Sequence, residues 1–120
     1  LFKALPQVFD AQVGHKDRAT VLPDGVHALA GSALCPLHAF RVGHLPIWAT
    51  QFHPELNELT MADRFRRYRA AYGPPGPDTD TSADEAFLGA LRPTDEASLL
   101  LGLFTRWVVD FEAALDSPRR

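Results

Sequence analysis

The sequence predicts an α/β fold, with short strands in the first half of the chain and helices in the second half. Short apolar runs, separated by glycine- and proline-containing turns, follow one another closely up to residue 56. A segment rich in proline and glycine, residues 73–78, then reads as a surface loop. Beyond it, apolar residues repeat at spacings of three and four, which indicates an amphipathic helix. With 46% hydrophobic residues in 120, the chain can bury a core.

Five strands are expected from alternation and β-branched content, at residues 7–13, 17–22, 26–30, 37–42 and 47–52. The turn Pro23-Asp24-Gly25 separates the second and third of them, because proline and glycine suit successive turn positions. The connections between the strands are too short for a crossover helix. We therefore expect a largely antiparallel meander.

Three helices are expected, at residues 61–72, 83–91 and 95–115. Thr60 is predicted to cap the first, with Asp63 completing a capping box, and Thr94 is predicted to cap the last. The apolar face of the last helix is expected to pack against the sheet; it consists of Leu100, Leu103, Phe104, Trp107, Val108 and Phe111.

The composition excludes several classes of partner. A net charge of -3 leaves no basic footprint for nucleic acid. The longest apolar run, residues 99–104, is far shorter than the ~20 residues of a membrane span. A single cysteine, Cys35, excludes an internal disulfide and fits a reducing, cytoplasmic location. The chain starts at Leu1 without a signal-peptide pattern, and we expect it to be a fragment of a longer domain.

The segment Gln51-Phe52-His53-Pro54-Glu55-Leu56 carries the strongest chemical signal. Proline restricts the residue before it to an extended conformation, so His53 leaves its strand in a preset direction. A carboxylate two residues later can return to the imidazole, hold its tautomer and stabilise its charged form. The segment therefore resembles the base and the orienting group of a catalytic triad, although a structural His–Glu pair fits the tripeptide as well.

The remaining residues offer no clear candidate for a nucleophile or a metal site. Cys35 lies in a connection between two strands without a strand-to-helix elbow, and we interpret it as a small buried hydrophobic residue. The five histidines form no helical i,i+4 pair and have no cysteine cluster. We expect no metal and no cofactor.

Five separated segments, in order, resemble the C-terminal half of class I, triad-type glutamine amidotransferases, above all the stand-alone proteins similar to the amidotransferase domain of GMP synthase. They are Gly14-His15-Lys16-Asp17, Leu22-Pro23-Asp24-Gly25, Ala28-Leu29-Ala30-Gly31-Ser32, Pro36-Leu37-His38-Ala39-Phe40 and Gln51-Phe52-His53-Pro54-Glu55. The resemblance implies a flavodoxin-like three-layer fold. Residues 1–56 would be its C-terminal sheet region, with partly antiparallel late strands, and residues 57–120 its C-terminal helical region.

The resemblance also implies roles for particular residues. His53 would activate the thiol of a cysteine in an upstream Gly-x-Cys-x-Gly elbow, and Glu55 would orient the imidazole. The segment containing Gly14, His15 and Asp17 would line the glutamine pocket, although a structural turn fits these residues equally well. The implied partners are glutamine, the upstream half of the same domain and a synthase or acceptor domain. Because the elbow is missing, this chain alone is expected to be inactive.

Two other functions remain open at this point. A related hydrolase of the same fold could cleave γ-glutamyl amides without any acceptor. A non-catalytic binding module could instead retain His-Pro-Glu without its chemistry. The arginines between Arg64 and Arg69 could attract an anionic acceptor, but a solvated helix face explains them more simply.

Overall fold

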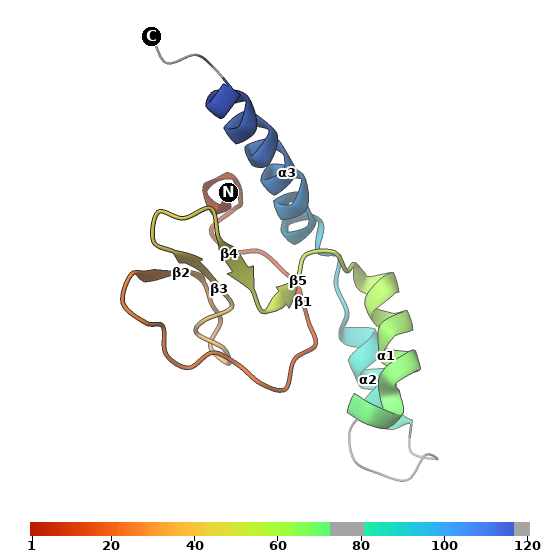
Figure 1. Cartoon of the computed structure of the whole chain (residues 1–120). Coiled ribbons are helices and arrows are strands. Elements are labelled where there is room, and N and C mark those ends of the chain that lie inside the picture. The colour runs from red at the N-terminus through yellow and green to blue at the C-terminus, as the bar shows by residue number, and fades with distance from the viewer. Residues whose placement is uncertain (73–80, 117–120) are drawn as a thin grey trace.

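The computed structural model describes residues 1–72 and 81–116, and it has the α/β architecture that the sequence predicts (Figure 1). The predicted loop at 73–78 lies outside the described residues. A single 3-10 turn, Phe2–Ala4, precedes the strands. The strands form two antiparallel sheets and are β1 (Gln12–Val13), β2 (Val26–Ala30), β3 (Ala39–Val42), β4 (Trp48–Thr50) and β5 (Phe52–His53).

The larger sheet is the expected antiparallel meander, in the order β2-β3-β4. Two glycines with positive φ lie at its turns, Gly25 at +78° and Gly43 at +49°, where a side chain would strain the backbone. The Gly43 amide donates to the Gly25 carbonyl at 2.6 Å and so joins the two turns. The third and fourth predicted strands are confirmed as β2 and β3. The fifth, predicted at 47–52, is divided, because Trp48–Thr50 forms β4 of this sheet and Phe52–His53 forms β5 of the smaller one.

The first predicted strand is much shorter in the structure, and the second does not form. Only Gln12–Val13 of the segment 7–13 forms a strand, β1, which pairs with β5. Residues 17–22 form no strand. The Ala19 amide donates to a side-chain oxygen, Gln51 Oε1, at 2.8 Å instead of to a neighbouring strand. Such side-chain bonds compete with strand pairing and cannot be read from alternation alone.

The core is small and lies where the two sheets meet the beginning of the last helix. Ala39, Phe52, Ala97 and Leu100 are buried together. The N-terminal segment covers them, and the Phe9 ring packs edge-on against Phe52 with centroids 5.9 Å apart. Phe52 immediately precedes His53, so this core anchors the strand that carries the candidate histidine.

Helices α1 (Glu58–Tyr72) and α2 (Ser82–Ala90) lie side by side, away from the larger sheet (Figure 1). The rings of Phe65 and Phe87 stack between them with centroids 4.4 Å apart. Arg69 Nε donates to Asp84 Oδ2 at 2.5 Å, and both side chains are largely buried. An apolar stack and a charge-assisted hydrogen bond therefore hold this helix pair together.

The first helix begins three residues earlier than predicted, and its cap is Asn57 rather than Thr60. Asn57 Oδ1 accepts from the Thr60 amide at 2.9 Å, while Thr60 Oγ1 accepts from the Asn57 amide at 2.9 Å. This is a reciprocal capping box that satisfies two amides at the helix start. Asp63, the predicted partner, instead pairs with Arg66 one turn later at 3.1 Å.

Replacing Asn57 with alanine should lower the free energy of unfolding by about 1 kcal/mol, because the Thr60 amide loses its side-chain acceptor. The matched control is Asp63→Ala, which removes only an exposed i,i+3 pair and should change stability by less than about 0.5 kcal/mol. Urea unfolding of the two variants checks this. A larger loss of stability for Asp63→Ala than for Asn57→Ala would indicate that Asp63 is part of the cap, as the sequence predicts.

The last helix, α3 (Asp95–Asp116), packs its apolar face on the larger sheet for part of its length. Trp107 meets Trp48 of β4 edge-on with centroids 4.9 Å apart, as expected for a sheet-packing face. Further along, Phe111 is 43% exposed, so the predicted packing against the sheet holds for only part of this face. Figure 1 shows this end of α3 projecting beyond the sheets.

The residue before α3, Thr94, is almost completely buried. Its hydroxyl donates to the Leu56 carbonyl at 3.0 Å, and its own carbonyl accepts the Ser98 amide at 3.1 Å. Thr94 thus ties the start of α3 to the segment following His-Pro-Glu. Within residues 1–72 and 81–116, none of the helices has both the length and the apolar character needed to cross a bilayer.

Candidate functional site

His53 and Glu55 lie together where β5 ends. Glu55 Oε1 and His53 Nδ1 are 2.7 Å apart, so the carboxylate accepts a hydrogen bond from the ring. A proton on Nδ1 leaves Nε2 as the basic nitrogen, which is the tautomer a general base needs. Pro54 joins the two residues and holds the chain in the turn that returns the carboxylate to the ring.

The Glu55 carboxylate is stabilised in its ionised form. Burial raises the pKa of Glu55, but hydrogen bonds from its own backbone amide and from His53 lower it, as do the charges of His53 and Arg64. The net result is a pKa below the ordinary value of 4.5. The contribution of the Glu55 carboxylate to the free energy of unfolding is therefore fully present at neutral pH. It is lost only as the pH falls through the lowered pKa of Glu55.

Replacing His53 with alanine should raise the pKa of Glu55, because it removes both a hydrogen bond and a positive neighbour. Arg64→Ala removes only a charge and should raise the pKa less. The Glu55 side-chain carboxyl signal, followed by NMR during an acid titration, measures both changes. An unchanged Glu55 titration in His53→Ala would mean that the pair does not form in solution.

Gly14 lies beside the His53 ring because of the pairing between β1 and β5. Gln12 is the register partner of His53, and two residues later the chain passes the imidazole. A Cβ built on Gly14 would be 3.9 Å from His53 Nε2 and 3.8 Å from the Met61 methyl carbon. The Gly14 backbone thus borders the free nitrogen of the candidate base.

Gln12 anchors this arrangement and was not singled out from the sequence. It is 5% exposed, and its Nε2 donates to the Arg92 carbonyl at 2.8 Å, across the segment between α2 and α3. A polar residue in a strand of two residues gives no sequence signal for such a role. Only its partner, eighty positions away, makes the contact visible.

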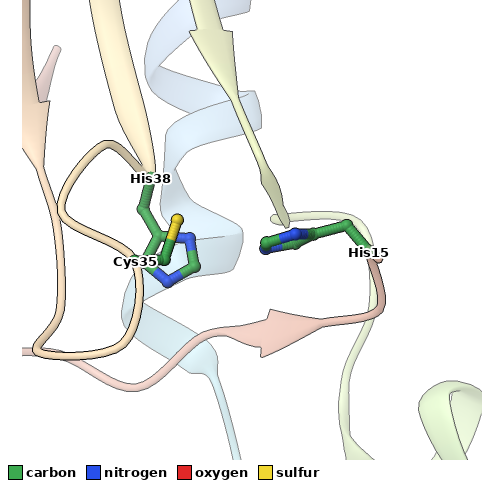
Figure 2. Close-up of side chains that lie close together, drawn as sticks. All are labelled: His15, Cys35 and His38. Atoms are coloured by element: carbon green, nitrogen blue, oxygen red, sulfur yellow. The ribbon is translucent and has the colours of Figure 1, made fainter. Parts of the chain in front are cut away.

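Of the other two residues of the predicted glutamine pocket, His15 belongs to a different group, and Asp17 contributes only a backbone carbonyl to it. The His15 Nδ1 atom donates to the Asp17 backbone carbonyl at 2.8 Å, and the ring meets His38 edge-on with centroids 5.6 Å apart. Figure 2 shows His15 pointing toward His38 and Cys35. Of the predicted pocket residues, the structure therefore places Gly14 beside His53 and His15 in this second cluster.

Cys35 is 4% exposed, which confirms its interpretation as a buried residue. Its sulfur accepts a hydrogen bond from Gln51 Nε2 at 3.3 Å. The pKa of the neighbouring His38 is lowered by burial and then by the proximity of His15, which favours the neutral ring. His15, Cys35 and His38 each have a ligand-type atom within 4.8 Å of the others. We call these three residues the His-Cys-His cluster.

The sequence contains one local signal for the His-Cys-His cluster, although it is not a helical i,i+4 pair. Cys35 and His38 form a Cys-x-x-His spacing across a turn and the start of a strand. His15 reaches them only through the tertiary structure.

An open pocket of about 670 Å³ lies between the N-terminal segment and β2. Phe9, Gly31, His38 and Phe52 are among its lining residues, whereas His53 and Glu55 are not. This hollow is thus not centred on the candidate dyad. Acid–base chemistry requires positioned groups, and it is His53 and Glu55, outside this hollow, that have the hydrogen-bonded geometry for it.

The chain thus combines antiparallel sheets, C-terminal helices and a His-Pro-Glu turn. Comparison with known sequences identifies the class of protein that has these features. Residues 1–66, more than half of the chain, match the family model of class-I glutamine amidotransferases. The chain belongs to this family.

Similar proteins include glutamine-hydrolyzing GMP synthase subunits A from archaea. The protein of Methanocaldococcus jannaschii is 41% identical over 56 residues, which cover 47% of this chain and 30% of the relative. That of Thermococcus kodakarensis is 35% identical over 74 residues, covering 61% and 39% respectively. The Pyrococcus abyssi protein is 39% identical over 56 residues, covering 47% and 30%. The chain thus spans about a third of the length of these relatives, and no solved structure gives a significant match.

Proposed function

We propose that this chain supplies the histidine and the glutamate of a Cys-His-Glu triad that hydrolyses the side-chain amide of glutamine and releases ammonia. The observation that carries the proposal is the 2.7 Å contact between His53 Nδ1 and Glu55 Oε1 in a member of the class-I glutamine amidotransferase family. The names of the similar proteins, glutamine-hydrolyzing GMP synthases, support the same reaction.

His53 would act first as a base and then as an acid. Its Nε2 would take the proton of a cysteine thiol, and the resulting thiolate would attack the amide carbon of glutamine. The proton would then pass to the departing nitrogen, which leaves as ammonia, and water would hydrolyse the thioester to glutamate. Glu55 would hold the ring in its Nδ1-protonated form and stabilise the imidazolium in each step.

The nucleophile would come from residues outside this chain, in the preceding half of the same domain. Cys35, the single cysteine of the 120 residues, is buried and accepts a hydrogen bond from Gln51. It also lacks the strand-to-helix elbow that exposes a nucleophile. The chain by itself is therefore proposed to be inactive, with His53 and Glu55 completing a site on the intact protein.

The glutamine pocket would be completed in the same way. The Gly14 backbone, which borders the His53 ring, is the part of the predicted pocket that lies nearest the proposed chemistry. A synthase subunit or acceptor domain would receive the ammonia. This partner is proposed because the similar proteins are named as subunits A of GMP synthase.

The test is the release of ammonia from glutamine by the intact protein, compared with release of the leaving group from a γ-glutamyl anilide. Faster turnover of glutamine supports the amidotransferase. Preference for the anilide would replace it with a γ-glutamyl hydrolase of the same fold. If circular dichroism shows that the protein is folded and it catalyses neither reaction, the proposal is overturned and a binding module remains.

A further inference from the structure

We propose that His15, Cys35 and His38 form a binding site for a divalent cation of borderline softness, with Zn²⁺ the best fit. The inference does not depend on the proposed glutaminase. It concerns different side chains from the His53–Glu55 dyad, and it would hold if the protein proved catalytically inactive.

The three side chains converge from two parts of the chain, the segment after β1 and the β2–β3 connection. His15 lies in the segment after β1, Cys35 in the β2–β3 connection, and His38 immediately before β3 (Figure 2). Their ligand-type atoms are within 4.8 Å of one another. Ligand atoms around a tetrahedral zinc are roughly 3.3–3.6 Å apart, so small side-chain rotations would close the site.

Each candidate ligand has its lone pair available. A carbonyl can only accept, so the 2.8 Å contact between His15 Nδ1 and the Asp17 carbonyl places the proton on Nδ1 and leaves Nε2 free. A backbone carbonyl that holds the second nitrogen in this way is the usual support of a metal-binding histidine. Within the described part of the chain, His38 Nδ1 is buried without a hydrogen-bond partner. Such an atom normally has a partner, and a cation would provide one.

The cysteine is supported in a similar way. Gln51 Nε2 donates to the Cys35 sulfur at 3.3 Å and to the Leu37 carbonyl at 3.2 Å. Gln51 Oε1 accepts from the Ala19 amide at 2.8 Å, which fixes the orientation of the side-chain amide. The sulfur therefore faces a donor that would stabilise a metal-bound thiolate. Two imidazoles and one thiolate suit Zn²⁺, with a fourth position for water or another group.

Binding would also constrain the neighbourhood of the candidate dyad. His15 directly follows Gly14, whose backbone borders the His53 ring. A cation held by His15, Cys35 and His38 would fasten the segment after β1 to the β2–β3 connection. This segment is otherwise held at Lys16, whose Nζ donates to the Ala71 carbonyl near the end of α1 at 3.2 Å. The proposed role is thus structural.

The experiment is a calorimetric titration of the intact protein, freed of metal, with Zn²⁺, followed by a titration with Co²⁺ observed by absorption. We expect one Zn²⁺ per chain and a near-ultraviolet thiolate-to-cobalt band. Removing a direct ligand should weaken Zn²⁺ binding at least as much as removing a supporting residue does, by about tenfold or more. The variants are His15→Ala, His38→Ala and Cys35→Ser, and the cobalt band should disappear in Cys35→Ser.

The matched control is His27→Ala, which removes an exposed histidine of β2 outside the cluster. Its Zn²⁺ affinity and cobalt band should equal those of the unaltered protein. His15 is exposed, so His15→Ala keeps the test decisive if the buried Cys35 variant fails to fold. The proposal is overturned if no Zn²⁺ binds, if His15→Ala binds as tightly as the unaltered protein, or if His27→Ala weakens binding equally.

Discussion

Replacing His53 with alanine in the intact protein is expected to reduce ammonia release from glutamine by on the order of 10⁴-fold or more, as loss of a triad base does in other enzymes. The variant removes the proposed proton acceptor for the thiol and the proton donor for ammonia. It also leaves Glu55 without its partner at 2.7 Å. The measurement is steady-state ammonia release at neutral pH, with kcat and KM determined separately.

Two further variants make this result specific. His44→Ala removes an exposed histidine in the turn between β3 and β4 and should leave turnover unchanged. Glu55→Ala should lower kcat less than His53→Ala does, because the imidazole remains and only its orientation and charge stabilisation are lost. Near-normal turnover in His53→Ala would remove this residue from the mechanism.

Replacing Gly31 with alanine is expected to lower the free energy of unfolding by about 3 kcal/mol, at the upper end of the cost of overpacking. A Cβ at this position would lie 2.2 Å from the Pro36 carbonyl oxygen and 2.7 Å from the Pro36 carbonyl carbon. Both are backbone atoms, which cannot swing aside as a flexible side chain could. The β2–β3 connection would have to move as a unit.

The control for this variant is Gly102→Ala in α3, where an added Cβ meets nothing within 4 Å. Alanine in an open helical position should stabilise the protein by about 0.5–1 kcal/mol. Urea unfolding of the intact protein measures both variants, which should therefore change the midpoint in opposite directions. A midpoint for Gly31→Ala at or above that of the unaltered protein would show that the connection yields without cost.

Local physics explains which parts of the fold could be predicted from the sequence. Periodicity predicts the helix at 95–115, and the structure places Trp107 of its apolar face on Trp48. The predicted start of α1 is wrong because two capping patterns overlap: Thr60 can cap a helix, but it is also the third helical residue and closes the box that Asn57 opens. Competition between such local hydrogen bonds is settled only when the whole helix forms.

The prediction of a strand at 17–22 failed for a longer-range reason. The Ala19 amide bonds to Gln51 Oε1, thirty-two residues away, and the Arg18 guanidinium donates to the Leu34 carbonyl. The first of these bonds uses a backbone amide that a strand ladder would need, and the second fixes the Arg18 side chain on the β2–β3 connection. Alternation records only which residues would suit a strand and contains no information about distant hydrogen-bond partners.

The sequence by itself determined the proximity of His53 and Glu55, since a proline between them restricts the backbone and two residues are enough for the side chains to meet. Only the tertiary structure decided what surrounds them. The pairing of β1 with β5 brings the Gly14 backbone to the His53 ring, while the folding of the β2–β3 connection brings Cys35 and His38 to His15. Contacts between residues twenty to forty positions apart depend on strand register and on packing of the whole chain, and the residue types at either end do not specify them.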